Sequence, residues 1–216
     1  KMAEERNITD IVRYGQKAAN LKVRGEVVEC APFLTFQFQV DEGEKHTISS
    51  HLIGAYNIDN MLAAITIGLE FGVSIDAICH ALENYIPNNN RSQFEQTADN
   101  ILIVDAYNAN PSSMMAALQN FNIMKADNKM AILGDMRELG EVSEEEHQKI
   151  VDFIASTNIN NVWLVGSKYA KTNCNFRKFD DIEQVKAAIA ENKPKNHCIL
   201  IKGSNGIKLF QLPELL

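Results

Sequence analysis

Residues 101–114 read ILIVDAYNANPSSM, an apolar run of strand length followed by a polar loop and a helix start. Pro111 suits the first turn of a helix, and Asn110 before it can cap that helix. Further apolar runs of similar length follow at 130–133, 162–165 and 198–201. Because helical patterns lie between these runs, the second half of the chain predicts an α/β fold with a parallel, doubly wound sheet.

Two of the helices between these strands have recognisable signals. Ser143 with Glu146 three residues later has the pattern of a capping box, and a further helix is expected near 182–190. His147 lies inside the first of these helices, where a surface or capping role is expected of it ahead of a catalytic one.

The first part of the chain has a different pattern. Alternating apolar and polar residues over 34–40 predict antiparallel strands within 20–50. From 58 to 71 the apolar residues recur at helical spacing, and Gly72 ends that helix. Ser74 can cap a second helix, whose buried side is expected to include Tyr85.

The polar segment 87–90 (Pro-Asn-Asn-Asn) is typical of a linker, so we place a domain boundary there, between domains 1–90 and 91–216. Residues 1–6 have the pattern of a helix end without a helix start. Residues 11–15 resemble a strand that joins a sheet midway, and the chain is therefore expected to be a fragment.

Composition narrows the class of protein. The 216 residues are 45% hydrophobic and carry a net charge of −7, which is typical of a globular chain and makes nucleic acid or an anionic membrane an improbable partner. No apolar run approaches the roughly 18 residues that span a bilayer. The four cysteines lack the spacing of a zinc site, so reduced thiols in a cytoplasmic protein are expected.

Polar and charged residues follow each predicted strand of the second domain. In parallel sheets a ligand crevice lies beyond the carboxyl ends of the strands. There, Asp105 and Asp135 could hold an ammonium group, whereas Lys202 and the backbone of 203–206 could hold a carboxylate or phosphate. Each Gly or Asp is also an ordinary turn former. No G-x-x-x-x-G-K-[ST] phosphate loop and no G-x-G-x-x-G dinucleotide fingerprint occurs in the chain.

Four strings taken together resemble the Mur ligase family. They are Gly54 to Ala64 (GAYNIDNMLAA), Asp105 to Met114 (DAYNANPSSM), Leu133 to Gly140 (LGDMRELG) with Ser143 and His147, and Ile201 to Asn205 (IKGSN). Their order and spacing match over most of the chain. The resemblance implies the back part of a central ATPase domain, followed by a Rossmann-like C-terminal domain.

The resemblance also implies an activity. It is that of the ATP-dependent ligases that add D-alanyl-D-alanine to UDP-N-acetylmuramoyl-tripeptide through an acyl phosphate, in peptidoglycan precursor synthesis. ATP and Mg²⁺ are the implied cofactors, with the phosphate loop and the magnesium ligands upstream of this chain. The chain alone is expected to be inactive, and the enzyme is expected to be a cytoplasmic monomer with small-molecule substrates.

Site residues follow from the resemblance, motif by motif. The nucleotide is expected at Asn57, Asn60, Arg91 and Asp105. Substrate contacts are expected at Tyr107, Asn108, Asn110 and Ser204, and catalytic roles at Asp135 and Lys202. No metal ligand is expected within the chain, and Tyr56 replaces a family histidine, which leaves the role of that position open.

Two alternatives remain open. Another Mur-type ligase, or a folylpolyglutamate or cyanophycin synthetase, would keep the fold and change the amine substrate. A non-catalytic nucleotide- or peptide-binding module would also fit a chain without a phosphate loop.

Overall fold

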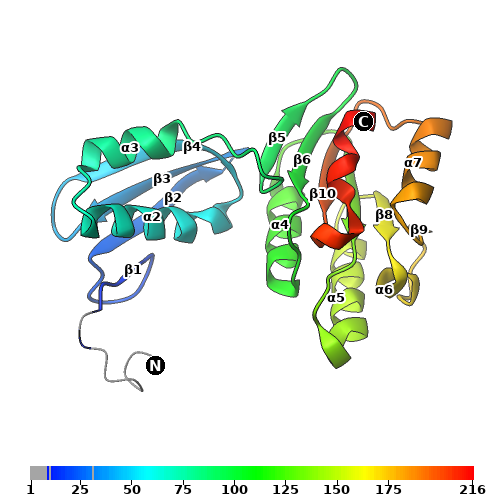
Figure 1. The fold of residues 1–216 in the computed structure, drawn as a ribbon, viewed down its shortest axis with the longest axis horizontal. Coiled ribbons are helices and arrows are strands. Elements are labelled where there is room, and N and C mark those ends of the chain that lie inside the picture. Colours follow the sequence, from blue (N-terminus) through cyan, green and yellow to red (C-terminus); the bar gives the residue numbers. More distant parts are fainter. Residues whose placement is uncertain (1–8, 10, 31) are drawn as a thin grey trace. The chain divides into compact units, whose positions relative to one another are not determined.

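The computed structural model describes residues 9, 11–30 and 32–216, and its contacts divide the chain into two units, Lys1–Ile86 and Pro87–Leu216 (Figure 1). Each unit is described by itself. The helix end expected over residues 1–6 lies outside the described residues.

The first unit contains a four-stranded sheet whose strands lie in chain order. The strands are β1 (Tyr14–Gly15), β2 (Val23–Cys30), β3 (Phe33–Val40) and β4 (Lys45–Ile53). The expected antiparallel pairing is confirmed for β2, β3 and β4, while β1 joins the edge of β2 in parallel. Helices α2 (Ile58–Glu70) and α3 (Ile75–Glu83) lie along this sheet (Figure 1).

The alternation in β3 explains why α2 packs on one face of the sheet. Phe36 and Phe38 point into a core that includes Leu62 and Ile65 of α2. Gly25 of β2 lets the helix come close, because a Cβ atom there would lie 2.6 Å from Cδ2 of Leu62.

The ends of the two helices are as expected, with one difference. Gly72 has a φ of 76° after α2, and Ser74 caps α3 by accepting a hydrogen bond from the backbone N–H of Ala77 at 3.3 Å. Tyr85, expected on the buried side, is instead 45% exposed, since α3 ends at Glu83 and Tyr85 follows it.

The second unit contains a six-stranded sheet in the order β5-β6-β10-β7-β8-β9. The strands are β5 (Gln93–Gln96), β6 (Ile101–Asp105), β7 (Lys129–Gly134), β8 (Asn161–Val165), β9 (Arg177–Phe179) and β10 (Cys198–Lys202). All pairs are parallel except β5 with β6, which confirms the expected doubly wound sheet. The short polar edge strands β5 and β9 have no apolar run, and the sequence pattern missed them.

Helices and turns cover both faces of this sheet. The helices are α4 (Pro111–Ile123), α5 (Ser143–Ala155), α6 (Ser167–Ala170) and α7 (Ile182–Glu191), and 3₁₀ turns span Gly140–Val142, Asn205–Ile207, Leu209–Gln211 and Pro213–Leu215. α5 packs against α4 and α6, whereas α7 packs against the C-terminal turns. Val185 of α7 and Leu209 share a core with alternate residues of the central strands, such as Ile199 and Ile201.

The start of α5 differs from the expected capping box. Ser143 is the first helical residue rather than the N-cap, and Val142 before it makes no side-chain capping bond. The carboxylate of Glu146 pairs with Lys149 instead of the backbone. The reason is the preceding 3₁₀ turn, which already supplies a helical approach to α5.

Within the described part of the chain, no helix is both long enough and apolar enough to cross a membrane.

Candidate functional site

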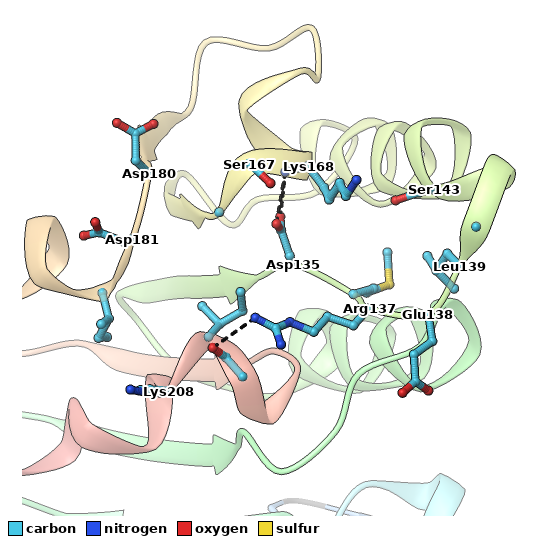
Figure 2. Close-up of a pocket in the computed structure, with 16 residues that line it drawn as sticks. Asp135, Arg137, Glu138, Leu139, Ser143, Ser167, Lys168, Asp180, Asp181 and Lys208 are labelled. Atoms are coloured by element: carbon cyan, nitrogen blue, oxygen red, sulfur yellow. Dashed lines mark hydrogen bonds between the residues drawn. The ribbon is translucent and has the colours of Figure 1, made fainter.

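A pocket of about 850 Å³ lies at the carboxyl edge of the six-stranded sheet, within the second unit (Figure 2). Four segments that follow strands β7, β8, β9 and β10 form its walls. Its lining residues are Asp135, Met136, Arg137, Glu138, Leu139, Gly140, Ser143, Gly166, Ser167, Lys168, Asp180, Asp181, Ile182, Gly206, Ile207 and Lys208. The segments after β7 and β8 lead to α5 and α6, whereas those after β9 and β10 lead to α7 and the C-terminal turns. Such a divergence opens a crevice in a doubly wound sheet.

Three cationic side chains line this pocket without carboxylate partners. Arg137, Lys168 and Lys208 form no ion pair with any described residue, although the whole chain carries a net charge of −7. Four carboxylates line the same pocket, those of Asp135, Glu138, Asp180 and Asp181, of which Asp135 and Asp181 accept backbone N–H bonds. The pocket therefore suits a small ligand that carries an anionic group, or a zwitterion.

Asp135 lines the pocket, but its carboxylate already has partners. It is 5% exposed and accepts backbone N–H bonds from Lys168 at 3.0 Å (Figure 2) and from Tyr169 at 3.0 Å. Gly166 permits this contact, since a Cβ atom there would lie 2.4 Å from the carboxylate. The carboxylate of Asp135 was expected to hold an ammonium group, but it instead binds backbone N–H groups at the start of α6.

His147, expected in a surface or capping role, is buried. It is 0% exposed, and its Nε2 atom accepts the backbone N–H of Met136 at 3.0 Å. Its Nδ1 atom lies 2.6 Å from the carbonyl oxygen of Ser143, to which it donates in the tautomer that both contacts require. The ring meets Tyr169 edge-on, with 4.7 Å between centroids. Burial raises the pKa of the Tyr169 phenol.

Lys202 and Asp105 form a buried ion pair. They are register partners at the ends of neighbouring strands β10 and β6, which brings Nζ of Lys202 within 2.5 Å of Oδ2 of Asp105. Lys202 is 1% exposed and also donates to the carbonyl oxygen of Asn108 at 3.3 Å. The predicted site residues Lys202 and Asp105 therefore form an ion pair with each other, and neither of them lines the pocket.

Arg91 and Tyr107 are a second pair of predicted site residues that the fold brings together. The guanidinium carbon of Arg91 lies 3.9 Å from the centre of the Tyr107 ring. Both side chains are exposed, and Arg91 forms no ion pair among the described residues. This arrangement leaves the guanidinium N–H groups available to an anion.

The remaining predicted substrate residues bond to nearby backbone. Asn108 accepts the N–H of Ala109 at 2.8 Å, and Asn110 caps α4 by accepting the N–H of Ser113 at 2.8 Å. Ser204 accepts the backbone N–H of Arg137 at 2.9 Å. These contacts shape the loops after β6, β7 and β10.

In the first unit, Asn57 orients Asn60. Asn57 is 7% exposed and donates from Nδ2 to the carbonyl oxygen of Ile53 at 2.8 Å. Its Oδ1 atom accepts from Nδ2 of the exposed Asn60 at 3.1 Å. Tyr56 packs its ring against Gly54, whose φ of 97° and close approach exclude a larger residue.

The described residues contain no group of three or more His, Cys, Asp or Glu side chains that could hold a metal ion.

Comparison with known families agrees with this geometry. The family described as "Mur ligase, glutamate ligase domain" matches residues 90–205, and "Mur ligase middle domain" matches residues 1–68. The chain belongs to the Mur ligase family. The resemblance of its motifs to that family, and the fold expected from it, are confirmed.

Curated relatives of this Mur ligase carry one name. The UDP-N-acetylmuramoyl-tripeptide–D-alanyl-D-alanine ligase of Bacillus subtilis is 30% identical over 79% of this chain and 40% of its own length. The protein of that name from Escherichia coli is 33% identical over 76% of this chain and 38% of its own length. The chain thus spans about two fifths of these relatives.

Solved structures match both units of the Mur ligase chain. A crystal structure of MurF from Acinetobacter baumannii has a TM-score of 0.80 at 25% identity, covering 98% of this chain and 49% of that chain. MurF ligase from Thermotoga maritima in complex with ADP has a TM-score of 0.77 at 18% identity, covering 94% of this chain and 47% of that chain, and shares the fold.

Of the site residues predicted for the second unit, Asp135 alone lines the pocket. Arg137 and Lys168 lie in the polar segments that follow β7 and β8, so their position after strands was a usable signal for them. Lys208 had no such signal in the sequence. It lies six residues after the end of β10, and the turn at Asn205–Ile207 brings it to the pocket.

Proposed function

We propose that the protein containing this chain is an ATP-dependent ligase that adds D-alanyl-D-alanine to UDP-N-acetylmuramoyl-tripeptide. The observation that carries the proposal is the pocket with three unpaired cations, in a domain whose relatives bear the name of that activity. The product would be a peptidoglycan precursor, and we propose a cytoplasmic monomer acting on small molecules.

The proposed reaction is the formation of an amide in two steps. ATP, together with Mg²⁺, supplies the phosphoryl group that converts the terminal carboxylate of the tripeptide to an acyl phosphate. The free amine of D-alanyl-D-alanine then attacks the acyl carbon, and inorganic phosphate leaves. The residues of this chain serve to bind and orient the reactants.

Two groups of residues fit a nucleotide. Asn60 presents an exposed amide whose orientation Asn57 sets, and such an amide can bond to the edge of a base. Arg91 presents an unpaired guanidinium stacked on Tyr107, which suits a phosphate oxygen. Asp105, expected at the nucleotide, serves in this proposal to hold Lys202.

The pocket fits the incoming dipeptide. Arg137, Lys168 and Lys208 can bind its terminal carboxylate, and Glu138 or Asp180 can attract its amino group. The side chain of Arg137, labelled in Figure 2, donates to the carbonyl oxygen of Gly206 at 3.3 Å. Such a mixed set of charges distinguishes a zwitterion from a simple anion.

The remaining predicted residues take supporting roles. Asp135 orients the start of α6 beside Lys168, and Lys202 ties β10 to the loop at Asn108. Asn110 and Ser204 shape neighbouring loops, while the exposed Tyr107 and the side chain of Asn108 stay proposed contacts for substrate.

The test is ADP release by the complete gene product, given ATP, magnesium and UDP-N-acetylmuramoyl-tripeptide with or without D-alanyl-D-alanine. We expect release that depends on the dipeptide. Release that depends on glutamate when a folate replaces the tripeptide would instead indicate a folylpolyglutamate-type ligase. No release with any amine would favour a non-catalytic binding module.

Arg137→Ala tests the pocket in the same assay. Loss of a charged hydrogen bond to a carboxylate is expected to raise the KM for the dipeptide by about tenfold or more, with the KM for ATP unchanged. Arg177→Ala is the matched control, because Arg177 is exposed and does not line the pocket. Equal effects of the two changes would argue against dipeptide binding in this pocket.

A further inference from the structure

We infer that His147 is a positioning residue that holds the loop after β7 so that Arg137 points into the pocket. His147 is fully buried and is not among the residues that line the pocket, so it contacts no ligand there. Its role is exerted through the backbone of Met136. The inference rests on the proposed function, because that function gives Arg137 its ligand.

The loop after β7 is held by side chains at two consecutive amides. The N–H of Met136 donates to Nε2 of His147 at 3.0 Å, and the N–H of Arg137 donates to Oγ of Ser204 at 2.9 Å. Both acceptors are buried, at 0% and 5% exposed. Immediately afterwards the backbone enters the left-handed region, with φ of 65° at Glu138, so this loop depends on outside contacts for its shape.

The imidazole of His147 is itself fixed in one orientation. Its Nδ1 atom bonds to the carbonyl oxygen of Ser143 at 2.6 Å, which ties the ring to the first turn of α5. The Tyr169 ring packs edge-on against it. Because Nδ1 carries the proton in this arrangement, Nε2 is the acceptor that Met136 requires.

Arg137 has little freedom once its backbone is held. Its Nη2 atom donates to the carbonyl oxygen of Gly206 at 3.3 Å. A Cβ atom on Gly206 would lie 2.2 Å from Nη1, so the guanidinium lies directly against that glycine. A shift of the Met136 amide would move the guanidinium away from this position, and the ligand carboxylate would lose a preset partner.

Two substitutions separate the bonds that His147 makes. His147→Asn keeps a donor near the Nδ1 position for Ser143 but has no acceptor that reaches Met136. His147→Gln places an oxygen near the Nε2 position, where it can accept the Met136 N–H. The Gln variant thus keeps the Met136 contact and gives up the Ser143 contact, whereas the Asn variant does the reverse.

In the complete gene product, we expect His147→Asn to raise the KM for D-alanyl-D-alanine by about tenfold, the effect of losing one buried hydrogen bond. The kcat and the KM for ATP should stay within about threefold of the parent enzyme. His147→Gln should restore the dipeptide KM to within about threefold. In the 216-residue chain, hydrogen exchange should show faster exchange of the Met136 amide in the Asn variant only.

The outcomes are distinct. An unchanged dipeptide KM in His147→Asn overturns the inference, even where the Met136 amide loses protection, since the loop would then be structural only. Equal KM increases in both variants overturn it too. A parent enzyme that releases no ADP in response to the dipeptide defeats the proposed function itself, and the positioning role with it.

Discussion

At the scale of single residues, the second unit contains buried polar groups with hydrogen-bond partners and one without, among the described residues. Lys202 has bonds to Asp105 and to the carbonyl oxygen of Asn108 that satisfy its buried ammonium group. The phenol oxygen of Tyr169 is also buried, yet it has no hydrogen-bond partner among the described residues. A buried hydroxyl without a partner loses its hydrogen bonds to water on folding, which destabilises the folded state.

Tyr169→Phe is therefore expected to raise the free energy of unfolding by about 1 kcal/mol, because it removes only the unpaired hydroxyl. Urea unfolding followed by the fluorescence of Trp163 measures this, since Trp163 is the one tryptophan and lies in the same unit. Tyr107→Phe, at a tyrosine that is 47% exposed, is the matched control and should change nothing. A loss of stability in Tyr169→Phe would mean that the hydroxyl has a partner such as a buried water.

At the scale of the elements, α4 and α5 begin in different ways. Asn110 and Ser113 form a reciprocal capping box at the start of α4, with Pro111 in its first turn. α5 follows a 3₁₀ turn, and Ser143 supplies its carbonyl oxygen to His147 from within the helix. Both helices have a capping signal in the sequence. In α4 the side chain of Asn110 caps the helix, whereas in α5 the carbonyl oxygen of Ser143 accepts a hydrogen bond from the buried His147.

Asn110→Ala should lower the free energy of unfolding of the second unit by about 1 kcal/mol, because the backbone N–H of Ser113 loses the side-chain oxygen that caps α4. Ser112→Ala, at the exposed neighbouring position in the same turn, should leave stability within about 0.5 kcal/mol of the parent chain. Both values come from the Trp163 unfolding curve. Equal losses in the two variants would contradict the capping role.

At the scale of the whole molecule, two hydrophobic cores among the described residues each lie within a single unit. One is built from β2, β3 and β4 with α2 and α3, and its members all lie in the first unit. The other packs alternate residues of the six-stranded sheet against α7 and the C-terminal turns, and its members all lie in the second unit. Leu118 of α4 and Ile154 of α5 are also buried in that unit. Neither of these cores includes a residue of the other unit.

Residues 87–216 produced alone should therefore fold, with Trp163 emission the same as in the 216-residue chain. The reason is that Trp163 is 6% exposed and packs on Phe179, 5.1 Å between ring centroids, inside the second core. Urea-unfolded protein provides the reference for an exposed tryptophan. Emission of the short chain at that reference wavelength would show that the second unit depends on the first.

Sequence alone determined the main elements of this chain and its family. Strand alternation over 34–40, the apolar runs from 101 onward and the Asn110 cap depend on neighbours in the chain, so local patterns suffice to predict them. The edge strands β5 and β9 were missed because their few residues pair at the margin of the sheet and need no apolar run.

Only the tertiary structure decided what the site residues contact. Lys202 and Asp105 are 97 residues apart in the chain, and their ion pair exists because β10 lies beside β6 in register. The burial of His147 and the entry of Lys208 into the pocket depend equally on packing between distant segments. A side chain's partners are set by the fold of the whole unit, whereas its strand or helix is set by its neighbours in sequence.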